Sequence, residues 1–393
     1  MKTSPKITVL IPTFNRGIYM KECLDSIFSQ SLPPIQIIVV NDCSTDPVKD
    51  ICESYGNKTI EYIESNQQLG KSEAINLGLA KVTGEYVWIF DDDDVALPDA
   101  LARFVGPLEK DSSFGFSYSS FYFTANRKDS KLLGEVISEL KVPDFKEKGF
   151  LISLLEANFL GGAALFARTS CYKEVGLFDP ELLRSQDYEM AIRITRRYKG
   201  IRVPGSPTFH YRQHEGIRGS SRDRFTVDHN LSKWLEYNQI FFRKLYRELP
   251  LEEYLLPRNS IETNKRQALL QRIAIMARKL LFPEVISDLR LLAQLDDPTP
   301  FTTQEYGIVR TMIIESPYDR EGGIYDDIGF FDEIQNLSQS SATLRLLRAK
   351  IFRAVLARFR KTPKLGEISN LLSRFFHLYF PIKSRKENAN IKH

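Results

Sequence analysis

Short apolar runs alternate with helical periodicity over the first ninety residues, and this alternation constrains the fold more than any other feature. Runs at 7–11, 35–40 and 86–90 are apolar on both faces, and a weaker one lies near 60–64. The intervening helices are predicted at 18–28, about 47–55 and about 72–81. Strands of this kind joined by helices predict an α/β fold with a mostly parallel, twisted sheet flanked by helices, whose ligands bind at the carboxyl ends of the strands.

Four consecutive acids, at 91–94, directly follow the last of these apolar runs. Adjacent carboxylates repel one another, so their position at the end of a buried strand predicts a hard divalent cation such as Mg²⁺ or Mn²⁺. Alternation along the strand end directs Asp91 and Asp93 to one side and Asp92 to the other. The alternative is an acidic surface turn that caps the following helix. The apolar strand before the acids and Pro98 after them favour the metal site.

The rest of the chain changes character twice. Residues from about 115 to 215 have a mixed α/β pattern, including one aromatic strand at 114–123 and a helix around 188–197. After about residue 228, apolar positions recur at helical spacing. We therefore predict three parts, which are an α/β domain at 1–230, a helical extension at 231–340 and a basic amphipathic tail at 341–393.

Most of the positive charge lies in that tail. Residues 341–393 contain thirteen Lys and Arg against two Glu, a balance of +11, so the formal charge of +4 leaves −7 for the other 340 residues. The body of the chain is therefore not expected to bind nucleic acid. Apolar positions at 344–359 fall on one side of a helical projection, and a second apolar cluster follows at 371–380. Two interpretations stay equally open, namely binding to an anionic membrane surface and docking on the same protein.

The sequence also bears on location. No apolar run reaches the roughly 18 to 20 residues needed to cross a bilayer, and the N-terminus lacks the pattern of a signal peptide. The cysteines have no CxxC spacing, and they are Cys23, Cys43, Cys52 and Cys171. These features predict a cytoplasmic protein with reduced thiols, which would be peripheral at the inner face of the membrane if its tail binds lipid.

Several short segments, taken in their order and spacing, resemble glycosyltransferase family 2. The N-terminal segments are 9–16 (VLIPTFNR), 39–46 (VVNDCSTD), Gly70-Lys71 with Asn76, and 90–94 (FDDDD) with Pro98. The later segments are Gly161-Gly162, 176–179 (GLFD), 186–188 (QDY) and 211–214 (YRQH). The resemblance covers about residues 5 to 222. It implies the GT-A fold, in which a Rossmann-like nucleotide-binding half is followed by a mixed acceptor half.

The resemblance implies a donor site at the ends of the first strands. It places Pro12, Thr13 and Asn15 around the nucleotide. Asp42 has only acceptor atoms, which suits the N3–H of uracil or thymine or the N–H edge of guanine, and UDP is favoured by family habit. Lys71 is expected near the nucleotide because it begins a helix whose free N–H groups attract anions. A solvated lysine at a helix start is the alternative.

Asp91 and Asp93 match the family's Asp-x-Asp motif. By that resemblance Asp91 lies near the ribose or a metal-bound water, Asp92 is a further donor residue, and Asp93 binds the Mn²⁺ or Mg²⁺ that bridges the diphosphate. A later segment resembles the loop that closes over the diphosphate. There His214 is expected to ligate the metal or contact phosphate, and Arg212 to contact phosphate with its planar fork.

Asp187 matches the family's catalytic base. It would take the proton from the acceptor hydroxyl as that oxygen attacks the anomeric carbon, whereas an ordinary helix N-cap is the alternative. One base with direct displacement predicts inversion. The departure is Gln186, where the family commonly carries Glu, and this affects how the acceptor is positioned. The implied activity is transfer of a sugar from a nucleotide-sugar donor to a hydroxyl of a glycan, lipid-linked or protein acceptor.

Two other functions compete with sugar transfer. A nucleotidyltransferase that makes sugar nucleotides would share the sheet and the metal, but it relies on a Gly-rich loop after the first strand, where this chain has PTFN at 12–15. A catalytically silent glycan-binding or scaffold protein of the same fold is the second alternative. Only Gln186 points to it, because the acids that match the family motifs are all present.

Overall fold

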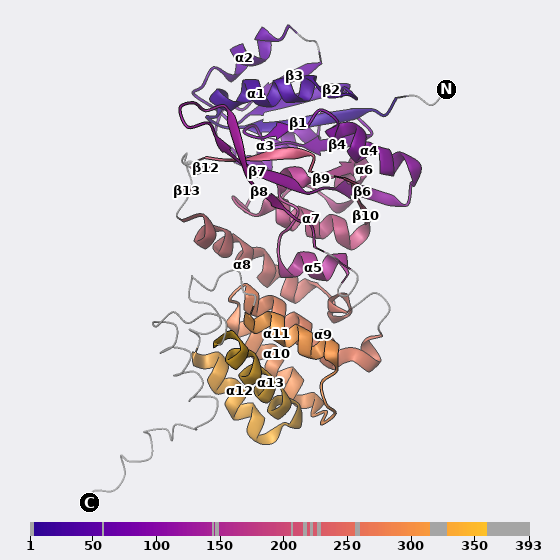
Figure 1. The fold of residues 1–393 in the computed structure, drawn as a ribbon, viewed down its shortest axis with the longest axis vertical. Helices are drawn as coiled ribbons and strands as arrows, with labels where there is room; N and C mark the ends of the chain where they lie inside the picture. The colour runs from indigo at the N-terminus through magenta and orange to yellow at the C-terminus, as the bar shows by residue number, and fades with distance from the viewer. Residues whose placement is uncertain are drawn as a thin grey trace, which may run out of the picture. The chain divides into compact units, whose positions relative to one another are not determined.

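The computed structural model describes most of the chain. The described residues are 4–56, 59–143, 145, 149–205, 207–214, 218–220, 223–225, 229–255, 260–314 and 328–359. The chain divides into two compact units, Met1–Tyr237 and Asn238–His393, which we call the N-terminal unit and the helical unit (Figure 1). The three-part organisation expected from the sequence, with its boundaries after 230 and 340, stays a prediction.

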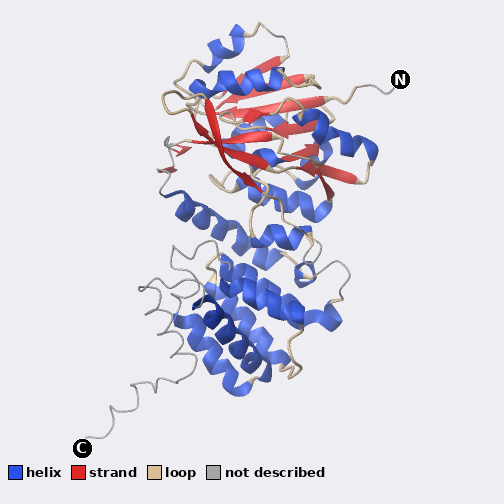
Figure 2. Cartoon of the chain, viewed as in Figure 1, coloured by secondary structure: helices blue, strands red, loops and turns tan. Residues whose placement is uncertain are grey.

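A seven-stranded sheet with the order β10-β6-β9-β4-β1-β2-β3 forms the centre of the N-terminal unit (Figure 2). Its strands in chain order are β1 (Ile7–Thr13), β2 (Gln36–Asn41), β3 (Ile60–Glu64), β4 (Tyr86–Ile89), β6 (Phe114–Tyr118), β9 (Leu165–Arg168) and β10 (Lys199–Arg202). Strands β4, β1, β2 and β3 are mutually parallel, and β9 runs antiparallel to its neighbours β4 and β6. The predicted fold class, a mostly parallel α/β sheet flanked by helices, is confirmed.

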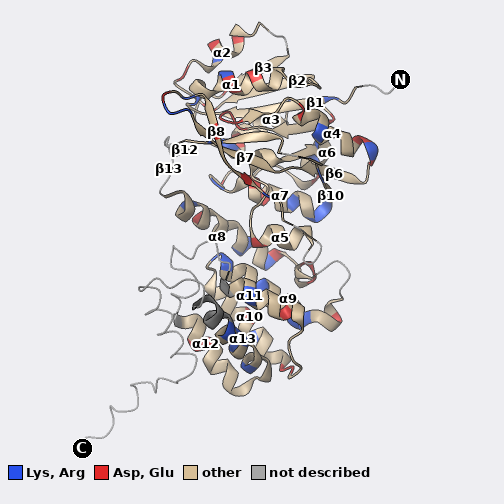
Figure 3. Ribbon diagram, viewed as in Figure 1, with Lys and Arg blue, Asp and Glu red and all other residues tan. Residues whose placement is uncertain are grey.

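Helices connect these strands and cover the sheet. The helices of this unit are α1 (Gly17–Phe28), α2 (Val48–Ser54), α3 (Lys71–Leu79), α4 (Ala100–Lys110), α5 (Phe150–Glu156), α6 (Thr169–Val175) and α7 (Gln186–Arg197). All seven residues of β1 are buried, and β1, β2 and β4 carry no charged residue (Figure 3). In the core, Trp88 packs between Phe90 and Phe104. The elements predicted in the first ninety residues lie within two residues of the observed ones.

The single aromatic strand predicted at 114–123 is wrong. Strand β6 ends at Tyr118, and β7 (Phe121–Asn126) begins a different, four-stranded sheet of order β5-β11-β7-β8. The other members of that sheet are β5 (Val95–Ala96), β8 (Leu133–Leu140) and β11 (Phe209–Gln213). The chain changes sheets at Ser119 and Ser120, which are buried and lie between Tyr118 and Phe121 in the sequence. Because both halves of the run are apolar, the periodicity does not reveal the break between them.

The second sheet joins the acidic segment to a distant part of the chain. β5 begins directly after the four acids and pairs antiparallel with β11, with Ala96 opposite Phe209 and Val95 opposite His210. The pairing carries the end of β11 to the acids. A short hairpin, β12 (Arg218–Ser220) with β13 (Asp223–Phe225), follows.

The helical unit consists of packed helices. They are the later part of α8 (Asn230–Glu248), α9 (Ile261–Arg278), α10 (Phe282–Leu295), α11 (Thr303–Ile314), α12 (Ile328–Ser340) and α13 (Ala342–Phe359). In α13, which is the described part of the basic tail, Leu344, Leu347 and Ile351 are fully buried against the same unit. The second apolar cluster, at 371–380, lies outside the described residues. None of the helices among the described residues has the length and apolar character that a membrane span requires.

Candidate active site

Three neighbouring strands end at one edge of the central sheet. Thr13 at the end of β1 is in register with Asn41 at the end of β2, and Phe90, which follows β4, donates its N–H to β1 at 2.9 Å. Asp42 and Asp91 therefore emerge at the same edge, one on each side of β1. This convergence is what the parallel sheet predicts for polar residues at the carboxyl ends of its strands.

A pocket of about 530 Å³ opens at this edge, within the usual range of roughly 300 to 1,000 Å³ for small-molecule sites. Residues predicted for the donor or the metal that line it are Pro12, Thr13, Asn15, Asp42, Lys71, Asp91, Asp92, Asp93 and His214. Residues that line it but were not predicted as site residues include Arg16, Tyr19, Gln68, Lys131, Arg184, Gln186 and Tyr211. The predicted donor residues therefore converge, with the exception of Arg212.

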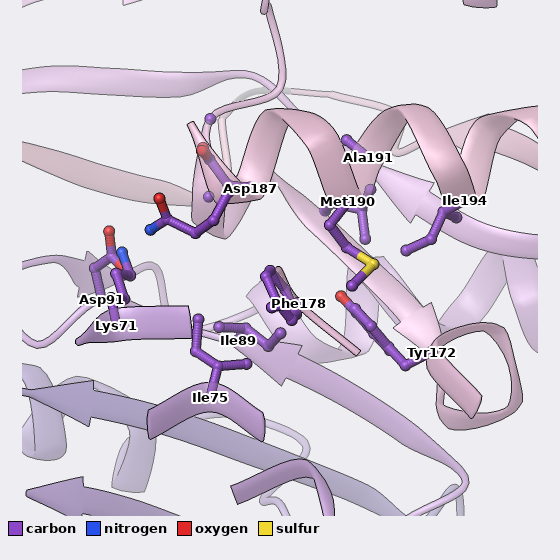
Figure 4. Close-up of a pocket in the computed structure, with 14 residues that line it drawn as sticks. Lys71, Ile75, Ile89, Asp91, Tyr172, Phe178, Asp187, Met190, Ala191 and Ile194 are labelled. Carbon is purple, nitrogen blue, oxygen red and sulfur yellow. The ribbon is translucent and has the colours of Figure 1, made fainter. Parts of the chain in front are cut away.

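Asp187 lines a smaller, adjoining pocket of about 30 Å³ (Figure 4). The two pockets share Lys71, Asp91 and Gln186. A Cβ placed on Gly162 would lie 3.7 Å from Asp91 Oδ2 and 3.8 Å from Asp187 Oδ2. The predicted base and the first acid of the Asp-x-Asp motif therefore face one space, which the missing side chain of Gly162 leaves open.

Asp187 lies in the first turn of α7. Ser185, which precedes the helix, has a left-handed backbone with φ of 58°, so the chain turns sharply as it enters the helix. Burial raises the pKa of Asp187, and nearby Asp91 raises it further, while Lys71 acts in the opposite direction without cancelling the rise. A carboxylate with a raised pKa is a stronger base for accepting a proton from a hydroxyl.

Cations of the chain contact three of the four consecutive acids directly. Lys71 Nζ donates to Asp91 Oδ1 at 2.6 Å. Arg16 Nη1 donates to Asp93 Oδ2 at 2.7 Å and to Asp92 Oδ1 at 3.1 Å. His214 Nε2 lies 3.0 Å from the same Asp93 Oδ2. Each acid that was predicted to handle the metal thus has a positively charged or imidazole neighbour.

Burial and the neighbouring charges give Asp92, Asp93 and Asp94 different pKa values. Burial raises the pKa of Asp92 to about 6, although Arg16 acts to lower it. It also raises the pKa of Asp94 well above the usual range, with Asp93 contributing. For Asp93 burial alone would raise the pKa, but Arg16 and His214 outweigh it and hold the pKa well below its ordinary value. The protein therefore relieves the repulsion among the acids in part by itself, so repulsion alone does not require a cation.

The donor atoms at this edge nevertheless fit a hard or borderline cation. Carboxylate oxygens of Asp91 and Asp93 with an imidazole nitrogen of His214 are a donor set that Mn²⁺ accepts, and Mg²⁺ accepts the two carboxylates. Asp93 and His214 are already in contact. Within the described part of the chain, no three or more such side chains are arranged around one point. Metal binding would therefore require Arg16 or Lys71 to release a carboxylate.

Arg212, which was expected to contact phosphate, lies buried among protein groups. Its side chain is fully buried, and its guanidinium donates to Glu22 Oε2 at 2.6 Å, to Asp93 O at 2.6 Å and to Asn126 Oδ1 at 2.9 Å. Its backbone N–H donates to Asp94 Oδ1 at 3.0 Å. These contacts fasten β11 to the acidic segment. The phosphate contact expected of Arg212 stays a prediction, and the structure gives the side chain a supporting position.

Asp42 is 3% exposed and orders the loop that precedes α3. Its Oδ1 accepts from Leu69 N at 2.7 Å and its Oδ2 from Gly70 N at 2.9 Å. The next residue, Lys71, begins the helix. A carboxylate oxygen can accept more than one hydrogen bond, so recognition of the base by Asp42 stays a prediction that these contacts permit.

Asn15 ties together the loops that follow β1 and β2. Its backbone is left-handed, with φ of 51°, a conformation that Asn tolerates better than most residues. Its Oδ1 accepts from Thr45 N at 2.8 Å, and its own N–H donates to Ser44 Oγ at 2.9 Å. The residue thereby shapes the pocket wall through the backbone, in addition to lining it.

Arg16 and Tyr19 are two of the pocket residues that were missed from the sequence. Arg16 directly follows Asn15 and is the only charged residue of the segment 9–16, a signal that could have marked it as a partner for the acids. Tyr19 lies beneath the Arg212 guanidinium, 4.9 Å from its centre, and packs against the His214 ring at 5.3 Å. No sequence pattern connects Tyr19 with residues so far along the chain.

Gln186 has an unusual environment. Its side chain is 5% exposed, and Oε1 has no hydrogen-bond partner among the described residues. An unsatisfied buried acceptor costs about 1 to 3 kcal/mol. Because Gln186 lines both pockets, the oxygen is placed to accept a hydrogen bond from a bound hydroxyl group.

The fold is shared with TarS of S. aureus. A crystal structure of TarS 1–349 in complex with UDP-GlcNAc has a TM-score of 0.52 and 18% sequence identity, covering 86% of this chain and 92% of that one. Another crystal structure of the same TarS segment has a TM-score of 0.50 and covers 91% of both chains. Identity this low shows the fold alone. That fold is the GT-A type, in agreement with the prediction.

Residues 8–174 match the model of glycosyl transferase family 2. An uncharacterized glycosyltransferase of Rickettsia typhi is 29% identical over 250 residues, which are 62% of this chain and 74% of that protein. WcaA of Escherichia coli, whose name connects it with colanic acid biosynthesis, is 27% identical over 201 residues, 50% of this chain and 69% of that protein. Residues 8–174 therefore match glycosyl transferase family 2, and the predicted enzyme class, a glycosyltransferase, is confirmed.

The chain matches only part of the length of several other relatives. The chain spans only 28% to 59% of the length of four further Rickettsia glycosyltransferases, at 28% to 30% identity. The shared part is the glycosyl transferase domain.

Proposed function

We propose that this glycosyltransferase moves a sugar from a UDP-sugar to a hydroxyl of a glycan, lipid-linked or protein acceptor, with inversion and with Mn²⁺ or Mg²⁺ as cofactor. The observation that carries the proposal is the approach of Asp91 and Asp187 to one space beside Gly162. A donor-site acid and a buried candidate base then lie beside the same opening. A single displacement needs this arrangement, because the incoming hydroxyl and the leaving phosphate must both reach the anomeric carbon.

The donor nucleotide is proposed to lie in the larger pocket. Pro12, Thr13 and Asn15 line its wall, and Asp42 offers acceptor atoms that suit the N3–H of uracil. The crystal structure of TarS that shares the fold contains UDP-GlcNAc, which supports a uridine nucleotide. Lys71, at the start of α3, adds a positive charge near the expected diphosphate.

The metal is proposed to bind Asp91, Asp93 and His214, the donor set that fits it. When bound, the cation offsets the negative charge that develops on the leaving diphosphate. Lys71 lies 2.6 Å from Asp91 and supplies a second positive charge at the same place. Arg212 contributes indirectly, because its buried contacts with Asp93 and Asp94 hold the acidic segment in position.

Asp187 is proposed to take the acceptor's proton. As the acceptor oxygen forms its bond to the anomeric carbon, the hydroxyl proton moves to the Asp187 carboxylate, and the bond from that carbon to the phosphate oxygen breaks. The bonding electrons leave with the nucleoside diphosphate. Because attack and departure occur on opposite faces, an α-linked donor gives a β-linked product. Gln186 Oε1, which has no other partner among the described residues, would hold a hydroxyl of the acceptor.

The acceptor is proposed to be a cell-surface glycan or its precursor, an idea supported by the name of WcaA. A cytoplasmic protein that binds the membrane through its tail would use residues 360–393, because Leu344, Leu347 and Ile351 of α13 are already buried in the helical unit. Sedimentation with anionic vesicles, for the full chain and for a chain ending at residue 359, tests this. Equal binding by the two proteins would contradict a lipid-binding tail.

The proposed function is tested by measuring nucleoside diphosphate release. The full chain is incubated with UDP-, dTDP- and GDP-sugars, each with and without Mn²⁺. We expect metal-dependent release from at least one UDP-sugar, because transferases leak some donor to water. A scaffold protein of the same fold would release none from any donor, and that result would contradict the proposal.

A further inference from the structure

Arg16 occupies the carboxylate that the proposed metal needs. Its Nη1 contacts Asp93 Oδ2 at 2.7 Å and Asp92 Oδ1 at 3.1 Å. His214 Nε2 approaches the same Asp93 Oδ2 at 3.0 Å. Arg16 and His214 therefore contact the same oxygen of Asp93, Oδ2. This oxygen already accepts a hydrogen bond from the Arg16 guanidinium.

This ion pair is built into the pocket and is shielded from solvent. The Arg16 side chain is 25% exposed, and those of Asp92 and Asp93 are 5% and 10% exposed. Charge-assisted hydrogen bonds in such a setting are stronger than exposed ion pairs. A divalent cation and a guanidinium repel each other, so both cannot hold one carboxylate oxygen at contact distance. A metal that binds Asp93 through Oδ2, the oxygen next to His214, must displace Arg16.

The pocket also offers Arg16 another partner once a donor is present. Arg16 lines the same pocket as Thr13, Asp42 and Lys71, which are the residues proposed to surround the nucleotide. A guanidinium binds phosphate oxygens with its planar fork as well as it binds a carboxylate. Binding of a diphosphate would therefore give Arg16 a replacement for Asp93.

We propose that Arg16 is a positioning residue that competes with the metal for Asp93 in the donor-free protein and thereby makes tight metal binding depend on the nucleotide. The inference rests on the proposed metal-dependent function and extends it to the order in which the site fills. Lys71 covers Asp91 in a similar way, but it also lies near Asp187, so its replacement would disturb the base as well. Arg16 is the cleaner residue to test.

The experiment measures Mn²⁺ binding by calorimetry to the full chain, without UDP and with saturating UDP. Arg16→Gln removes the competing charge, and Arg16→Lys retains it. The matched control is Lys21→Gln, which removes a positive charge from α1, the helix that begins next to Arg16. Lys21 is 73% exposed and pairs with Asp25 at 2.9 Å. None of these measurements requires turnover.

In the wild type, UDP should tighten Mn²⁺ binding about tenfold or more, within the usual range of coupling between two sites of about 5- to 150-fold. Arg16→Gln should bind Mn²⁺ without UDP about tenfold more tightly than the wild type, and UDP should tighten its Mn²⁺ binding by a smaller factor than in the wild type. Arg16→Lys and Lys21→Gln should behave as the wild type. Because ligands that bind the native state raise its apparent stability, Mn²⁺ alone should raise the melting temperature of Arg16→Gln more than that of the wild type.

The inference is overturned if Arg16→Gln binds Mn²⁺ without UDP no more tightly than the wild type, or if Lys21→Gln gains as much as Arg16→Gln. Failure of the proposed function looks different. If neither protein binds Mn²⁺ even with saturating UDP, the metal dependence itself is refuted, and the inference falls with it. If the wild type binds Mn²⁺ with UDP but Arg16→Gln shows no gain, only the role of Arg16 is refuted.

Discussion

Two buried ion pairs, one in each unit, differ in how completely their carboxylates are satisfied. In the helical unit, Asp288 is fully buried and accepts from Arg272 at 2.8 Å and 2.6 Å and from Tyr246 at 3.0 Å. Both of its oxygens have partners. In the N-terminal unit, Asp92 Oδ2 and Asp94 Oδ2 are buried without a hydrogen-bond partner among the described residues.

The difference separates a structural ion pair from a site that can accept a ligand. A buried charge whose hydrogen bonds are complete gains nothing from a further ligand, and removing one partner is costly. Buried acids with shifted pKa values and unsatisfied oxygens, placed beside a pocket, are typical of functional sites. Substitutions of Asp187, Asp288 and Asp92, together with the pH dependence of transfer, test this distinction.

The largest expected effect comes from the candidate base. Asp187→Asn should lower the rate of transfer by about 10² to 10⁴-fold, the usual contribution of general base catalysis, because the amide cannot accept the proton. Calorimetry with UDP and Mn²⁺ should show nearly unchanged donor binding. Glu181→Gln, an exposed acid shortly before α7, is the control and should retain activity. Loss of donor affinity in Asp187→Asn would contradict the assigned role.

The next effect concerns stability in the helical unit. Asp288→Asn should lower the free energy of unfolding by about 3 to 5 kcal/mol, because it leaves the Arg272 charge buried without compensation. Chemical denaturation followed by circular dichroism measures the change. A loss below about 1 kcal/mol would show that the pair is not the structural contact that its geometry indicates.

The pH dependence of transfer provides a third test. Burial and Asp91 raise the pKa of Asp187, and the base works only when it is deprotonated. The rate should therefore fall as the pH drops through this raised pKa. The fall should occur at a higher pH than for an ordinary aspartate, whose pKa is about 4. A pH profile of kcat at constant Mn²⁺ measures it. A rate that holds its full value down to about pH 4 would argue against Asp187 as the base.

The smallest effect is expected at Asp92, and its sign should be opposite to that at Asp288. The pKa of Asp92 in the folded protein is raised to about 6. Protonated Asp92 therefore favours the folded state at low pH, and this stabilisation is lost as the pH rises from the pKa of an unfolded aspartate, about 4, through about 6. Asp92→Asn removes the cost of burying the Asp92 charge, and Arg16 still pairs with Asp93. At pH 7 the free energy of unfolding should rise by about 1 to 3 kcal/mol, since the pKa is raised by about two units and one unit is about 1.4 kcal/mol. A clear loss of free energy of unfolding would show that Asp92, like Asp288, belongs to a structural ion pair.

The sequence predicted some parts of this structure better than others, for physical reasons. Strands β1, β2 and β4 were placed closely because they are apolar on both faces, which is the signature of a buried parallel strand. The break between β6 and β7 was missed because two serines inside an aromatic run look like part of one strand. The position of Arg212 depends on the second sheet, whose strands come from distant segments.

The site shows the same limit. Most of the expected donor residues line one pocket because they follow parallel strands, and the topology places such residues at one edge. Arg16 was missed because its partners, Asp92 and Asp93, lie more than seventy residues away. The pKa values of the acids depend on burial, which a run of four aspartates does not reveal.

A crystal structure of the full chain with Mn²⁺ and UDP tests the central claim most directly. We expect a metal bound by Asp93 with Asp91 or His214, a diphosphate on that metal, Arg16 turned away from Asp93, and Asp187 facing the open side beside Gly162. If Arg16 instead still contacts Asp92 and Asp93 in that crystal, while UDP lies elsewhere and the acids bind no metal, the proposed site is wrong.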